Sequence, residues 1–352
     1  MSRASRFVFA LTFAVLAVIR PVSAEELYVA NFGNGTVSHV VTNGSKVTNI
    51  AVGGGPRDVV STADGAYIYI AQQTIGGIAV IRTSDNAVLS GIATPSSPTK
   101  IAIGNSDTRL YVANNTLAAP HVTIVNISPN PNGTRANVVI GSIDLSSQGA
   151  SFATTVATFG SFLAIGTESG HVFLYDTSTS PVTLLANRTI GVIVKHISFA
   201  PGGTKLYVIL GSYIDAIDGD GNPTLFGNVH VLEVSSLVVK TVLGAGLNEL
   251  QYGGIIDGLY LYITSIDGNL FSVDAATDTL LNTLFVGSQL AGFATTDRKL
   301  YAANPAENLV QTVVLGRTPV NDRVDGSTVL PLGSSPLSVA VLPPAPKGKG
   351  KP

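Results

Sequence analysis

Leu27-Tyr28-Val29-Ala30-Asn31 is the first of seven similar five-residue segments that recur along the chain. The later copies begin at Ile68, Leu110, Phe162, Leu206, Leu261 and Leu300. Successive copies start 41, 42, 52, 44, 55 and 39 residues apart, close to the length of a four-stranded propeller blade with loop insertions. The repeat therefore predicts an all-β, seven-bladed β-propeller with very little helix.

Each repeat unit is expected to form four short antiparallel strands. In the second unit these strands fall over 57–61, 67–71, 77–82 and 87–92, where β-branched and aromatic residues predominate. Asp64-Gly65 supplies the first turn of this unit, and Ser84-Asp85-Asn86 supplies the third. The same order of strands and turns fits the other units.

The two ends of the chain are expected to share the first blade. The copy at Leu27 has no preceding inner strand, whereas Pro336–Val341 repeats the pattern of the inner strands that begin at Pro56 and Pro98. Pairing of this C-terminal strand with the first copy would close the ring and remove an exposed sheet edge.

The chain is expected to be a single propeller domain over residues 25–342. Residues 1–24 are typical of a signal peptide: Arg3 and Arg6 precede an apolar run, and Val22-Ser23-Ala24 offers small residues at a cleavage position. Residues 343–352 are rich in Pro, Gly and Lys and are expected to form a flexible tail. These features predict a secreted protein with no membrane association after signal cleavage.

The composition excludes several kinds of chemistry. Charged residues make up 12% of the chain and the net charge is −2, so nothing favours a nucleic-acid partner. The chain has no Cys and no Trp, which excludes disulfides, thiolate chemistry and Cys-based metal sites. The five histidines form no metal-binding motif, so we expect neither a metal nor another cofactor. The sequence leaves the oligomeric state open.

Six Asn-x-Ser/Thr sequons accompany the signal peptide, as expected for a glycoprotein made in a eukaryotic secretory pathway. The candidate acceptors are Asn34, Asn43, Asn114, Asn126, Asn132 and Asn187.

The LYVAN segments, each preceded by Pro-x-x-Val/Ile and a turn, resemble those of the YVTN-repeat propellers. The resemblance covers residues 27–342, nearly the whole mature chain, and it implies the propeller fold. The family includes surface-layer proteins and relatives of lactonases, so it implies no single activity. The insertions Ser128–Asn137 and Gly211–Gly227 are places where a specific function could have been added.

Superposition of the seven units suggests a functional site at one mouth of the central channel. Counting 13 residues back from the second residue of each copy brings together the starts of the inner strands, which should surround this mouth. The candidate ligand-binding residues are Arg57, Asp58, Phe152, Leu250, Gln289, Leu290 and Ser338. The candidate catalytic residues, which could polarise a carbonyl, are Lys100, Lys195, His196 and Gln251.

A mouth with a few polar groups on an apolar wall is typical of a small-molecule site. The preferred hypothesis is a cofactor-independent cyclase or pericyclase of secondary metabolism, acting by positioning and hydrogen bonding. The chain is similar in size, signal peptide and blade type to the secreted fungal hetero-Diels–Alderases of tropolone-sesquiterpenoid biosynthesis. One alternative is a non-catalytic extracellular propeller that binds a glycan or a protein. A weaker alternative is a lactonase using Asp58 and Arg57.

Overall fold

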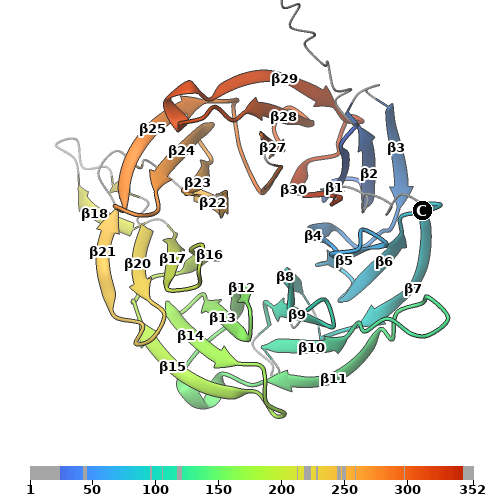
Figure 1. Cartoon of the computed structure of the whole chain (residues 1–352), viewed down its shortest axis with the longest axis horizontal. Coiled ribbons are helices and arrows are strands. Elements are labelled where there is room, and N and C mark those ends of the chain that lie inside the picture. Colours follow the sequence, from blue (N-terminus) through green and yellow to red (C-terminus); the bar gives the residue numbers. More distant parts are fainter. Residues whose placement is uncertain are drawn as a thin grey trace, which may run out of the picture.

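Seven four-stranded antiparallel sheets surround a central channel in the computed structural model of this chain (Figure 1), as the repeat predicted. The structure describes residues 24–343, apart from 43–45, 96, 105, 117–120, 212, 218–222, 227–228, 244–246, 248–250, 258 and 297. For 213–217, 223–226 and 251–257 it describes the backbone alone. The predicted signal peptide, apart from Ala24, and the tail, apart from Pro343, lie outside the described residues.

Every blade contains an innermost, a second, a third and an outermost strand. In blade order, the innermost strands are β30 (Pro336–Val341), β4 (Pro56–Ser61), β8 (Pro98–Gly104), β12 (Ala153–Phe159), β16 (Val194–Phe199), β22 (Gln251–Asp257) and β26 (Phe293–Thr295). In the same order, the second strands are β1 (Glu26–Asn31), β5 (Tyr67–Gln72), β9 (Arg109–Asn114), β13 (Phe162–Thr167), β17 (Lys205–Leu210), β23 (Tyr260–Ser265) and β27 (Lys299–Asn304).

The remaining strands form the outer part of the disc. The third strands are β2 (Thr36–Val41), β6 (Gly77–Arg82), β10 (Val122–Asn126), β14 (His171–Asp176), β20 (Val229–Glu233), β24 (Asn269–Asp274) and β28 (Leu309–Val314). The outermost strands are β3 (Lys46–Ala51), β7 (Ala87–Ala93), β11 (Val138–Ile143), β15 (Thr183–Thr189), β21 (Val239–Leu243), β25 (Thr279–Phe285) and β29 (Arg323–Val329).

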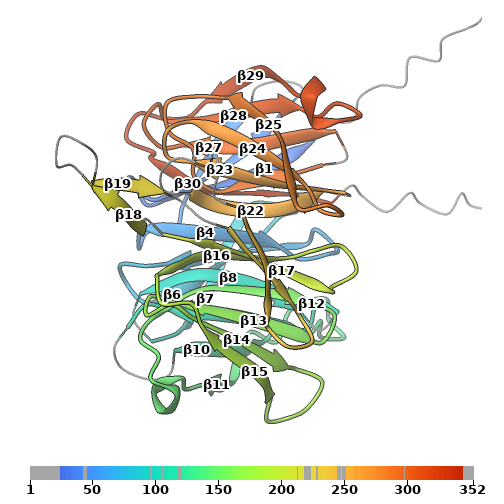
Figure 2. The same cartoon turned by 90° about the vertical axis from the view of Figure 1, so that its left-hand side faces the viewer.

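Little of the described chain lies outside these blades. An extra hairpin, β18 (Tyr213–Ile217) with β19 (Pro223–Phe226), projects from one face of the disc (Figure 2). The described residues contain two helical turns, both of the 3₁₀ type, at Ser146–Gln148 and Pro319–Asn321. Within the same residues, no helix has the length and apolar character needed to cross a bilayer.

The C-terminal strand β30 completes the first blade, which confirms the predicted closure. It pairs antiparallel with β1, with Leu27 opposite Val341 and Val29 opposite Val339. The first and last strands of the propeller therefore share one sheet. The inner edge of β1 is paired rather than exposed.

The alternation of the LYVAN segment explains why it recurs in the blades. Leu27 and Val29 point to one face of their sheet and join the core shared with the seventh blade, which includes Val310 and Ala303. Tyr28 and Ala30 point to the other face, into the core shared with the second blade. Because side chains alternate along a strand, one short segment fills both inter-blade cores.

The tyrosine of this segment also makes a hydrogen bond to the next blade. The hydroxyls of Tyr28, Tyr69 and Tyr207 donate at 2.6–2.7 Å to the side-chain oxygens of Asn86, Asn137 and Asp278, respectively. Each acceptor has a positive φ and directly precedes the outermost strand of its blade. Burial and the Asp278 carboxylate raise the pKa of Tyr207, so its phenol remains a donor at neutral pH.

The fourth copy of the repeat is displaced by one residue from its predicted position. The ladder partners place Leu163-Ala164-Ile165-Gly166-Thr167, and not Phe162–Gly166, in register with Leu110–Asn114. Alanine occupies the tyrosine position here, so the most recognisable residue of the segment is missing. Thr167 occupies the Asn position, where its hydroxyl accepts a 2.9 Å hydrogen bond from the His171 backbone.

The insertion Ser128–Asn137 is held against the side of the propeller by a buried arginine. The Arg135 guanidinium, 3% exposed, forms ion pairs of 2.6 Å with Asp64 and 3.0 Å with Asp107. It also donates to the carbonyl of Ile127 at 3.1 Å and lies over the ring of Tyr67. Arg135 thus links this loop to the first turns of the second and third blades.

The inter-blade tyrosine hydrogen bonds should contribute measurably to stability. Tyr207→Phe removes a bond to a carboxylate, and we expect it to lower the free energy of unfolding by about 1–3 kcal/mol. Tyr111 is the matched control, since its buried hydroxyl has no hydrogen-bond partner in the described structure. Tyr111→Phe should leave stability unchanged or raise it slightly. Denaturant unfolding of both variants provides the measurement, and equal losses would contradict this role.

Candidate functional site: the central channel

The channel wall is built from strand edges that have no neighbouring strand. Each innermost strand pairs with the second strand of its own blade, so its other edge faces the channel. The described wall borders an open cavity of about 470 Å³ between β4, β8, β12, β16, β26 and β30. The side chains of β22 are not described, so this wall is characterised for six of the seven blades.

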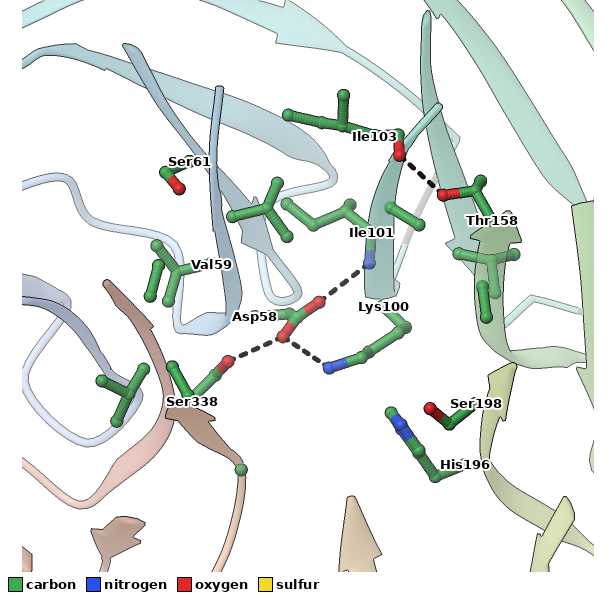
Figure 3. A pocket seen from close by; sticks show the side chains of 18 of the residues that line it. Asp58, Val59, Ser61, Lys100, Ile101, Ile103, Thr158, His196, Ser198 and Ser338 are labelled. Carbon is green, nitrogen blue, oxygen red and sulfur yellow. Dashed lines mark hydrogen bonds and ion pairs between the residues drawn. The ribbon is translucent and has the colours of Figure 1, made fainter. Parts of the chain in front are cut away.

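A buried carboxylate connects three blades at one end of the cavity (Figure 3). Asp58, which is 2% exposed, accepts hydrogen bonds at Oδ1 from Lys100 Nζ at 2.9 Å and from Ser338 Oγ at 2.8 Å. Its Oδ2 accepts a bond from the backbone N–H of Ile101 at 2.9 Å. Both carboxylate oxygens are therefore occupied by donors from the first and third blades.

Other free backbone groups of the inner strands are satisfied in a similar way. Thr158 Oγ1 donates to the Ile103 carbonyl at 2.6 Å, and Ser61 Oγ donates to the Val341 carbonyl at 3.2 Å. Between the seventh and first blades, the Gly292 backbone N–H donates directly to the Leu337 carbonyl at 2.8 Å. A Cβ at Gly292 would lie 2.8 Å from that carbonyl oxygen, so glycine permits this close approach.

The ammonium group of Lys100 is the part of this cluster that a ligand could reach. The Lys100 side chain is 28% exposed and lines the cavity, whereas Asp58 is enclosed. Asp58 uses one of its three N–H donors. His196 and Ser198 on β16 also line the cavity, and the side chain of His196 lies on the same side of the view as that of Lys100 (Figure 3). Lys100 and His196 together make one end of the cavity polar.

The rest of the described lining is largely apolar. It includes Val59, Ile101, Val156, Ile197 and Val339 along the strands. Three aromatic rings, those of Phe159, Phe199 and Phe293, also belong to the lining. The cavity therefore has one polar end and mostly hydrocarbon walls, as small-molecule sites commonly do. No group of three or more His, Asp or Glu side chains suited to a metal occurs among the described residues.

Two further cations, Arg57 and Lys195, lie at the β-bulges with which β4 and β16 begin. Arg57 Nη1 donates to Gln73 Oε1 at 2.9 Å. Burial and the positive charge of Arg57 lower the pKa of Lys195, an effect partly opposed by Glu168. Neither cation belongs to the described lining of the cavity, so they lie outside the polar end formed by Lys100 and His196.

The structure brings together the predicted ring residues of those blades whose first turns are equal in length. Asp58, Lys100, His196 and Ser338 occupy equivalent ladder positions and all line the cavity. In the fourth and seventh blades this position is held instead by Thr155 and Gly292, and in the sixth blade the predicted residue is also displaced from it. Phe152 lies ahead of β12, Leu290 is buried in the core between the sixth and seventh blades, and Gln289 is exposed.

The displacement comes from a fixed count of 13 residues across turns of different length and, in the fourth blade, also from the one-residue displacement of the repeat copy. Phe159 and Phe162 are joined by a two-residue turn, whereas Ser61 and Tyr67 are separated by five residues. In the sixth blade, Gln251 begins β22 opposite Ser265, the ladder position of Pro56 rather than of Asp58. Leu250 lies outside the described residues, as does the side chain of Gln251.

The sequence prediction also missed the far end of the cavity. It considered the first three positions of each inner strand, whereas the cavity continues to Thr158, Phe159, Ser198 and Phe199 at the strand ends. The signal was available, because aromatic residues end the predicted inner strands of two consecutive blades.

The predicted glycosylation sites differ in accessibility. Asn34, Asn132 and Asn187 are exposed, and Asn126 is half-buried. Asn114 is fully buried on β9, where its Nδ2 donates to Thr123 Oγ1 at 3.0 Å, so a glycan could not be attached to it in this folded state. Asn43 lies outside the described residues.

Substitution of Asp58 should destabilise the ring. Asp58→Asn places an amide among three donors and leaves the ammonium of Lys100 without its counter-ion, so we expect a loss of about 3 kcal/mol or more. Asp85→Asn is the control, since Asp85 pairs with Arg82 on the exposed surface of the same blade. The control should cause no measurable change. Chemical denaturation tests the difference, and an equally stable Asp58→Asn protein would contradict it.

Comparison with known proteins supports the fold and no particular activity. No protein-family model matches the sequence, and no curated protein matches it. The solved structures that resemble it include a protein of unknown function from Desulfotomaculum acetoxidans, with 15% identity and a TM-score of 0.68 over 91% of this chain and 99% of that one. A periplasmic gluconolactonase from Pseudomonas aeruginosa has 16% identity and a TM-score of 0.64 over 91% and 99% of the two chains. Hydrazine synthase from Kuenenia stuttgartiensis has 15% identity and a TM-score of 0.64, over 82% and 89%.

Proposed function

We propose that this protein binds a small, largely apolar organic molecule in the central cavity and orients it through a hydrogen bond from Lys100. The observation that carries the proposal is a 470 Å³ cavity with mostly aliphatic and aromatic walls and a part-exposed ammonium group at one end. This volume is in the usual range for small-molecule sites. A carbonyl or hydroxyl oxygen of the ligand would accept the bond.

The reaction that such a cavity suits best is a cyclisation between conjugated partners, of the hetero-Diels–Alder type. This addition forms two new σ bonds, loses no atoms and needs no cofactor. Positioning of the two partners in an apolar enclosure supplies most of the acceleration. An N–H donor at the heterodiene oxygen supplies more, because it stabilises the negative charge that develops there.

A lactonase is the second candidate, favoured by the structural likeness to the Pseudomonas gluconolactonase. In that reaction Lys100 would polarise the lactone carbonyl and His196, which also lines the cavity, would activate water. Asp58 is poorly suited to be the base because both of its oxygens already accept hydrogen bonds. Release of acid from glucono-δ-lactone would favour this candidate over the cyclase.

Replacement of Lys100 should impair the reaction. Because Lys100→Met leaves the buried Asp58 carboxylate without its counter-ion, thermal unfolding must establish that the variant remains folded. Purified protein is incubated with a polyene and an ortho-quinone-methide precursor, and the product ratio and stereochemistry are measured by chiral chromatography. We expect Lys100→Met to slow protein-dependent product formation about tenfold or more. Lys240→Met, at an exposed lysine on β21, should leave the rate unchanged. Products identical to those formed without protein would contradict the cyclase proposal.

We further propose that the protein is exported and that its mature chain begins at Glu25. In support, Glu25 already packs against the seventh blade, where its carboxylate accepts hydrogen bonds from Lys299 Nζ at 3.2 Å and from the Tyr301 hydroxyl. Expression in a eukaryotic secretory host should yield a chain starting at Glu25. Peptide mass spectrometry should find glycans at exposed sequons such as Asn132 and none at Asn114. A retained leader or a glycosylated Asn114 would contradict this.

A further inference from the structure

Aromatic rings are concentrated on one side of the cavity, at the end away from Asp58. Phe159 ends β12, and Phe199 ends β16 in the next blade. Their ring centroids lie 5.9 Å apart with the planes tilted by 33°. The ring of Phe162 extends the cluster, with its centroid 6.5 Å from that of Phe199 and nearly parallel to it.

The Phe159 ring is held in place, yet a large part of it is uncovered. Its side chain is 39% exposed while also lining the cavity. Gly203, with φ +67°, lies directly against the ring, since a Cβ at Gly203 would come within 2.3 Å of its carbons. With Phe199 on another side, the ring has little freedom to turn. An uncovered, fixed aromatic ring is a suitable surface for a flat ligand.

The equivalent positions in other described blades carry no such ring. Gly104 occupies the ladder position of Phe159 on β8, and the positions equivalent to Phe199 hold Ser61 and Ile103. The Thr158 hydroxyl, next to Phe159, is already bonded to a backbone carbonyl. A ligand at this end of the cavity would therefore meet the paired aromatic rings of Phe159 and Phe199 on the side formed by β12 and β16.

We propose that Phe159, supported by Phe199 and Gly203, selects ligands with a planar, unsaturated ring. The inference rests on the proposed small-molecule site and narrows its ligand class. Aromatic rings attract one another through offset stacking or edge-to-face contact, beyond the area that they bury. A saturated, puckered ring of the same carbon skeleton would fill space but would lack this interaction.

Two probes with the same skeleton test the inference: 2-naphthol, which is planar, and decahydro-2-naphthol, which is saturated. Both carry one hydroxyl for the polar end of the cavity. We expect the mature wild-type chain to bind 2-naphthol about 3- to 10-fold more tightly, measured by calorimetry and by ligand-observed NMR titration.

Two leucine variants identify the ring responsible. Phe159→Leu keeps the site apolar and should reduce the preference for 2-naphthol to about twofold or less. Phe285→Leu is the matched control, since Phe285 is 64% exposed on the outermost strand β25, and it should retain the full preference. Thermal unfolding of both variants establishes that they remain folded.

The outcomes separate this inference from the proposed function. Binding of both probes with equal affinity would overturn the selection for planar rings while leaving the small-molecule site intact. Binding of neither probe would overturn both proposals. A preference for 2-naphthol that survives Phe159→Leu would show that another part of the wall selects the ring, and would overturn the role of Phe159.

Discussion

The unpaired edge of each innermost strand is the constraint on which the rest of this structure depends. A buried backbone N–H or carbonyl without a partner costs free energy, and the channel places seven such edges close together. Side chains from neighbouring blades supply the partners: Asp58 accepts from the Ile101 N–H, and Thr158 donates to the Ile103 carbonyl. The same bonds satisfy the edges and join adjacent blades.

The same constraint determines which polar groups at the channel serve the structure alone and which could still bind a ligand. Asp58 is an unusual residue to find buried, and by its type alone it would attract a catalytic assignment. Its three donors leave it no free oxygen for a substrate, while its partner Lys100 keeps donors to spare. A ligand at the polar end of the cavity would therefore meet the positively charged ammonium group of Lys100, although the Asp58–Lys100 ion pair as a whole is neutral.

The sequence was sufficient to predict the fold because nearly every blade uses the same pattern of core side chains. Leu, Tyr, Val and Ala of the repeat fill two inter-blade cores, so the pattern is visible wherever a blade occurs. The site was only partly predictable. Asp58, Lys100, His196 and Ser338 were aligned correctly, whereas the shorter turns of the fourth and seventh blades displaced Phe152 and Leu290.

Other errors have equally local causes. A sequon looks the same on a strand as in a turn, so the burial of Asn114 depends on a pairing partner that the triplet does not reveal. The aromatic end of the cavity arises because the inner strands of two consecutive blades, the fourth and the fifth, both end in phenylalanine. A propeller with identical blades would have a symmetric channel, and its departures from symmetry are what give this one a polar end and an aromatic side.

The pairing of β30 with β1 has a consequence for how the molecule folds. Most blades can form from contiguous hairpins, whose strands are close in sequence. The first blade instead needs Val341 to find Leu27, residues at opposite ends of the propeller, and so carries the largest entropic cost of loop closure. Until that encounter the edge of β1 is open to strands of other molecules, so a chain whose ring has not yet closed is exposed to aggregation.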